Sequence, residues 1–84
     1  MNINVNQACE LALSFSGWSY IESITKIETG YVFGLLDENG DIPIESPIIV
    51  KDNGEIEIFF PPDHLEELNN PNNYKIIVPN KYSL

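Results

Sequence analysis

The stretch Pro47-Ile48-Ile49-Val50-Lys51-Asp52-Asn53-Gly54-Glu55-Ile56-Glu57-Ile58-Phe59-Phe60 decides the fold of this chain. Asn53-Gly54 interrupts it with the residue types that tolerate the positive φ of a tight turn. After the turn, apolar and acidic residues alternate with the period of a β-strand, which sets Ile56, Ile58 and Phe60 on one face and Glu55 and Glu57 on the other. The stretch from Ile48 to Phe60 therefore predicts a β-hairpin.

Two further strands are expected on the N-terminal side of this hairpin. Residues Tyr31 to Leu36 are apolar and aromatic, and Asp37-Glu38-Asn39-Gly40-Asp41 follows them as a turn. The segment from Trp18 to Glu28 is ambiguous, because Ser19 followed by Glu22 suits a helical capping box. Its β-branched and aromatic residues favour a strand, which we predict here, with some irregularity.

A helix is predicted over Val5 to Ser16. Asn4 or Asn6 is placed to cap its start, and Gly17 stands where a helix end favours glycine. The apolar stripe that this helix turns to the core consists of Val5, Ala8, Cys9, Ala12 and Phe15, widened by Leu11 and Leu13.

The C-terminal part is predicted from its prolines and asparagines. Pro61-Pro62 stops the hairpin strand, and Asp63 is expected to cap a short helical turn from His64 to Leu68. We expect a loop, a last strand and a loose tail in the segments that follow, which are Asn69 to Asn73, Tyr74 to Val78 and the residues after Pro79.

Together these elements predict one α+β domain over residues 1–84. It has an N-terminal helix packed on a mostly antiparallel β-sheet of about four strands, with a short C-terminal helical turn. A chain of 84 residues is short for two hydrophobic cores, so a single domain is expected.

The charge balance narrows the class of partner. The chain has 13 Asp and Glu residues against four Lys, for a net charge of −9. Direct binding of nucleic acid or of an anionic membrane surface is therefore not expected. A basic protein partner is the natural complement of this charge, although acidic residues also serve simply to keep a protein in solution.

The compartment is inferred from the cysteine count and the N-terminus. Cys9 is the only cysteine, which fits a reducing environment. Residues Met1 to Gln7 lack the basic and apolar regions of a signal peptide, and the apolar runs are too short to span a bilayer. A cytoplasmic protein is expected.

The chain is poor in the residues that catalysis needs, so we expect no enzyme, no metal and no cofactor. His64 is the only histidine and is expected at the surface, whereas Cys9 is expected in the core. Asp37, Asn39 and Asp41 have the first spacings of a calcium loop, but Ile48 occupies its twelfth position and cannot ligate, so a plain hairpin turn is expected.

Protein binding through a surface is the remaining class of function. Candidate partner-binding residues are acids at the two turns and on the hairpin strand, namely Asp37, Glu38, Asp41, Asp52, Glu55 and Glu57. The alternative is a merely solvated sheet face. The aromatic residues Trp18, Tyr20, Tyr31 and Tyr82 are either interface anchors or core residues.

The order of several short stretches resembles the YrhB-type family of small bacterial immunity proteins over about residues 5–70. These stretches are Gly30-Tyr31-Val32-Phe33, the hairpin from Pro47 to Ile56, Pro61-Pro62 and Leu65-Glu66-Glu67-Leu68. The chain departs from the family pattern in having Tyr31 where the family often has Trp, and in its short closing helix. The resemblance implies a protein that neutralises a toxin by binding it, and it carries over no binding residue.

The expected function is therefore an immunity or inhibitor protein that blocks a toxic enzyme through an acidic surface. A phage-type inhibitor or nucleic-acid mimic aimed at a host defence nuclease, and a cystatin-like peptidase inhibitor, are the alternatives. A homo-oligomer formed through an edge strand also stays open, because the predicted sheet has few lysines to guard its edges.

Overall fold

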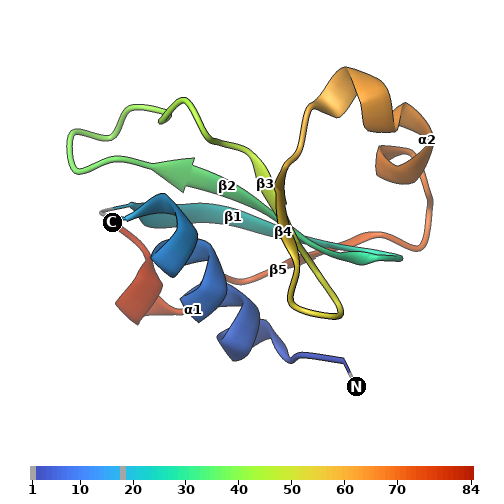
Figure 1. Ribbon diagram of the computed structural model, residues 1–84, viewed down its shortest axis with the longest axis horizontal. Helices are drawn as coiled ribbons and strands as arrows, with labels where there is room; N and C mark the ends of the chain where they lie inside the picture. Colours follow the sequence, from blue (N-terminus) through green and yellow to red (C-terminus); the bar gives the residue numbers. More distant parts are fainter. Residues whose placement is uncertain (1, 18) are drawn as a thin grey trace.

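The computed structural model describes residues 2–17 and 19–84 and confirms the α+β architecture. A single five-stranded antiparallel sheet has the order β4-β3-β2-β1-β5, one strand more than the expected four (Figure 1). The elements are α1 (Val5–Ser16), β1 (Tyr20–Ile27), β2 (Gly30–Leu36), β3 (Ile48–Lys51), β4 (Ile56–Ile58), the 3₁₀ turn η1 (Pro61–His64), α2 (Leu65–Leu68), β5 (Tyr74–Ile76) and the 3₁₀ turn η2 (Asn80–Tyr82).

Helix α1 has the predicted bounds. Asn4 caps it in a reciprocal capping box with Gln7, and Gly17 ends it at a φ of 77°. Its buried residues are Ala8, Cys9 and Ala12, as predicted. The expectation that Phe15 belongs to the buried stripe is wrong, because this residue of the last helical turn is 45% exposed.

The sheet has two apolar faces, and a different element covers each. Helix α1 covers the first face, and in Figure 1 it lies below the sheet while α2 lies above it. Side chains of this first face come from the three central strands and are Ile21, Ile24, Tyr31, Phe33, Leu35, Ile48 and Val50. The second face buries a smaller cluster of Ile27, Val32, Ile49 and Phe59, against which Leu68 of α2 packs.

The ambiguous segment forms strand β1 over Tyr20–Ile27, as predicted. Its pairing with β2 shifts register between Ile21 and Ser23, which is the expected irregularity. Trp18, part of the same predicted segment and a candidate anchor, lies outside the described residues.

Two predictions for the C-terminal part are wrong. Asp63 caps no helix, because the helical turn begins at Pro61, whose fixed φ suits a first helical position. The tail after Pro79 is not loose. It forms η2 and buries Tyr82, whose hydroxyl donates a hydrogen bond of 2.6 Å to Glu10 Oε1. The same contact raises the pKa of the Tyr82 phenol, because a carboxylate acceptor favours the protonated form.

Gly30 gives a stability test of the close approach between β2 and β3. A Cβ atom there would overlap the backbone carbonyl oxygen of Val50, whereas a Cβ at Gly34 would meet the rotatable hydroxyl of Ser23. We expect Gly30→Ala to lower the free energy of unfolding by about 1–3 kcal/mol, the usual cost of overpacking. The matched Gly34→Ala variant should change it by less than about 1 kcal/mol, because the hydroxyl can rotate away. Urea unfolding of both variants measures this, and equal losses would contradict the packing described here.

Candidate protein-binding surface

A long loop of residues 37–47 joins β2 to β3 and begins with a hydrogen-bonded turn. Asp37 Oδ1 accepts hydrogen bonds from the backbone N–H groups of Asn39 (2.8 Å) and Asp41 (3.0 Å). The N–H of Gly40, which has a φ of 82°, donates to the carbonyl oxygen of Asp37 at 3.0 Å. The predicted turn is thus present, and β3, which pairs antiparallel with β2, begins at Ile48, where the next strand was expected.

The rest of this loop presents two isoleucines to solvent. Ile42 is 71% exposed and Ile44 is 97% exposed, and Pro43 stands between them. The loop is anchored again at Ser46, whose Oγ accepts a hydrogen bond from the N–H of Leu35 at 2.9 Å. Ile42 and Ile44 are therefore two exposed apolar side chains held between two hydrogen-bonded points of the loop.

Carboxylates flank these isoleucines along the loop, and none of them forms an ion pair within residues 2–17 and 19–84. Glu38 and Asp41 are exposed, while Asp37 and Glu45 are half-buried. The sequence from Tyr31 to Val50 contains no Lys, Arg or His. We call residues 37–47 the acidic loop.

The structure divides the six candidate acids between opposite ends of the sheet. Because β2 and β3 are antiparallel, the loop that joins them lies at one end and the turn after β3 lies at the other. Asp37, Glu38 and Asp41 therefore belong to the acidic loop. Asp52, Glu55 and Glu57 lie at or near the opposite turn, so the six do not form one patch.

Two acids of the second group are engaged within the fold. Asp52 Oδ1 lies 3.7 Å from Lys26 Nζ, and Glu57 Oε2 lies 3.0 Å from Lys51 Nζ. The backbone of Asp52 also ties the N-terminal segment to the sheet, because its carbonyl oxygen accepts the N–H of Ile3 at 3.1 Å. Glu55, the remaining acid of this group, is exposed and makes no ion pair within the described residues.

Sequence reasoning missed Ile42 and Ile44. A signal was available, because Pro43 and Pro47 interrupt the run and a proline inside an apolar run argues against a central strand. Two of the candidate aromatic anchors are core residues, since Tyr31 is 8% and Tyr82 is 5% exposed, and Tyr20 is half-buried.

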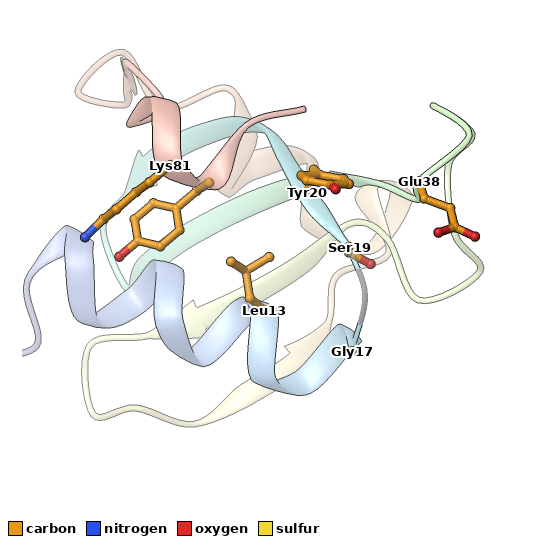
Figure 2. A pocket seen from close by; sticks show the side chains of 7 residues that line it. Leu13, Gly17, Ser19, Tyr20, Glu38 and Lys81 are labelled. Atoms are coloured by element: carbon orange, nitrogen blue, oxygen red, sulfur yellow. The ribbon is translucent and has the colours of Figure 1, made fainter.

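A shallow depression of about 280 Å³ lies between α1, the start of β1 and η2 (Figure 2). Leu13 and Tyr20 contribute apolar surface to it, and its charged groups, Glu38 and Lys81, stand on opposite sides. Small-molecule sites usually have polar groups that converge on the ligand. The separation of these two charges does not resemble such a site.

Cys9 and His64, the only cysteine and the only histidine of the sequence, lie on opposite sides of the sheet. Cys9 belongs to the core beneath α1, whereas the His64 ring stacks on Phe59 of the second face with 4.2 Å between ring centroids. His64 is half-buried and not fully at the surface as expected, and its Nδ1 lies 2.9 Å from Glu67 Oε1. Cys9 and His64 therefore do not form a catalytic pair.

Comparisons with models of protein families, with curated proteins and with solved structures gave no match. The resemblance to YrhB-type immunity proteins accordingly stays a prediction. Over residues 2–17 and 19–84, no helix has the length and apolar character needed to cross a membrane.

Burial of Cys9 gives a test that uses pH. Burial raises the pKa of its thiol to about 11, with the charge of Glu10 as the second cause. The folded state therefore holds the proton more tightly than the unfolded state, so this thiol's contribution to stability is lost as pH rises above the unfolded pKa of about 9. Urea unfolding should show a steeper loss of stability from pH 8.5 to 10.5 in the wild type than in Cys9→Ala. Parallel pH profiles of the two proteins would show that the thiol is not buried.

Proposed function

We propose that this chain is a small protein-binding inhibitor of the immunity type, which neutralises a basic toxic enzyme by direct contact through the acidic loop. The observation that carries the proposal is the pair of exposed isoleucines, Ile42 and Ile44, on a loop with four carboxylates and no cation between residues 31 and 50.

The two kinds of side chain on this loop have different tasks in the proposed complex. Burying an exposed Ile in a partner's pocket contributes about 1.5–3 kcal/mol, so Ile42 and Ile44 supply affinity. The carboxylates of Glu38 and Asp41 attract a basic surface and align it, so they supply association rate and specificity. The turn closed by Asp37 holds the loop in shape before binding, which lowers the entropic cost of the complex.

The partner's chemistry follows from the charge of the chain. An enzyme that cuts nucleic acid needs a cationic cleft to hold phosphates, and a net charge of −9 is attracted to such a cleft. The resemblance to immunity proteins supports the same proposal independently of the charge. Because toxin and inhibitor meet inside the cell in this scheme, a cytoplasmic location is part of the proposal.

Capture of the partner, followed by a comparison of variants, tests this function. The tagged chain is used to retain proteins from lysate of its own source, which are eluted by a salt gradient. We expect a basic protein in stoichiometric amount, whose enzymatic activity falls to zero at one equivalent of this chain. Nucleic acid should compete with the chain for that protein.

Matched variants assign the binding to the loop. Ile42→Ser/Ile44→Ser should weaken binding at least about 100-fold, given the burial energies of two Ile side chains. Glu38→Gln/Asp41→Asn/Glu45→Gln should slow association at least about tenfold. The control Glu22→Gln/Glu28→Gln/Glu66→Gln removes three exposed carboxylates outside the loop and should have a much smaller effect. If the loop variants bind as tightly as the wild type, or no protein is retained, the proposal is wrong.

A further inference from the structure

Strand β4 forms one edge of the sheet, and its outer backbone groups face away from β3. The N–H of Lys51 donates to the carbonyl oxygen of Glu55 at 2.7 Å, and the N–H of Phe59 donates to that of Pro47 at 2.8 Å. In an antiparallel ladder, alternate residues direct their N–H and C=O groups to opposite sides. The N–H and C=O groups of Ile56 and Ile58 therefore point outward, and no described strand pairs with them.

The side chains along this edge are apolar and exposed on one face of the sheet. Ile58 is 60% and Phe60 is 59% exposed. Both lie on the face that α1 covers, since Ile58 pairs with Ile48 of the core beneath the helix. The opposite face of the same edge carries Glu55 and Glu57, both exposed.

The edge is only partly protected against pairing with another strand. Native edge strands are protected by short length, by charged residues and lysine above all, by proline or by a bulge. Strand β4 is short, with three residues, and carries Glu57, but it has no lysine, proline or bulge along Ile56–Ile58, whereas the opposite edge strand, β5, carries the exposed Lys75. An edge with outward backbone groups and apolar side chains on one face is a template for an additional strand.

We infer that the β4 edge accepts an extended segment of a basic partner as a sixth strand, in which apolar residues alternate with Lys or Arg. The apolar residues lie beside Ile58 and Phe60, and the cations lie beside Glu55 and Glu57. This inference rests on the proposed function for the basic character of the partner, but it concerns a surface separate from the acidic loop.

Charge decides between this occupant and a second copy of the chain. Pairing of two β4 strands would bring Glu55 and Glu57 of each copy onto one face, and each copy carries a net charge of −9. Like charges on neighbouring strands are destabilising. A cationic strand removes that repulsion and gains an opposite-charge pair with Glu55, whereas Glu57 already lies 3.0 Å from Lys51 Nζ and would be shared with it.

A synthetic peptide tests the inference without the natural partner. The probe is acetyl-Lys-Val-Lys-Val-Lys-Val-Lys-amide, titrated into the full ¹⁵N-labelled chain and followed by NMR. We expect saturable binding, with the largest shifts at the amides of Ile56, Ile58 and Phe60 and slowed exchange of the Ile58 N–H. Shifts centred on other elements, or no saturation, would overturn the inference.

Two modified peptides distinguish strand pairing from a general attraction of the cationic peptide to an acidic protein. N-methylation of only the valines and of only the lysines blocks N–H groups on opposite sides of the peptide strand. One of the two methylated peptides should lose binding and the other should retain it. Which of them binds shows whether the peptide runs parallel or antiparallel to β4. Equal binding of both peptides would contradict strand pairing.

Ile58→Lys should weaken binding at least tenfold, because the lysine guards the edge. The matched variant Ile77→Lys makes the same charge change at a residue that is 92% exposed after β5, and it should have little effect. If both variants weakened peptide binding equally, the effect would come from the added positive charge alone, and the inference would be overturned. Failure of these experiments does not affect capture through the acidic loop, so the two proposals fail separately.

Discussion

The structure depends on the packing of three small residues of α1 against the centre of the sheet. Ala8, Cys9 and Ala12 are 0% exposed, and they belong to one cluster with Phe33 and Val50. Small side chains let the helix come close to the strands, so the large residues of β2 and β3 fill the space beneath it. The N-terminal segment and η2 join this arrangement through the backbone of Asp52 and the Tyr82–Glu10 hydrogen bond. Ile58 and Phe60 remain exposed on the same face of the sheet.

Strand β4 is short because the chain turns away from the sheet to cover Phe59 on its second face. Phe59 is 1% exposed and belongs to the second-face cluster, so its neighbour Phe60 points the other way and stays in solvent. Pro61 then begins a helical turn, and the chain leaves the sheet to cover Phe59 with His64. The fold thus closes both of its cores and leaves apolar side chains exposed at the end of β4 and on the acidic loop.

Periodicity predicted the elements whose pattern is local. The helix over Val5–Ser16 and the turn at Asn53-Gly54 were predictable because spacing, caps and turn residues agree within a few positions. The order of Tyr82 was not predictable, because it depends on Glu10, which is distant in the sequence. The acidic residues were correctly placed at turns, but their separation into two ends follows from strand pairing and not from composition. The exposure of Ile42 and Ile44 was missed although Pro43 and Pro47, which interrupt the run, argue against a central strand there.

The central claim is that charge on the acidic loop guides a basic protein to two apolar contacts. The most direct test is the association rate of this chain with its captured partner, measured by stopped flow at salt concentrations from about 50 to 500 mM, over which screening shortens the range of surface charge several-fold. The account predicts that the association rate constant falls at least about tenfold while the dissociation rate constant changes little. An association rate constant that does not change over this range would contradict it.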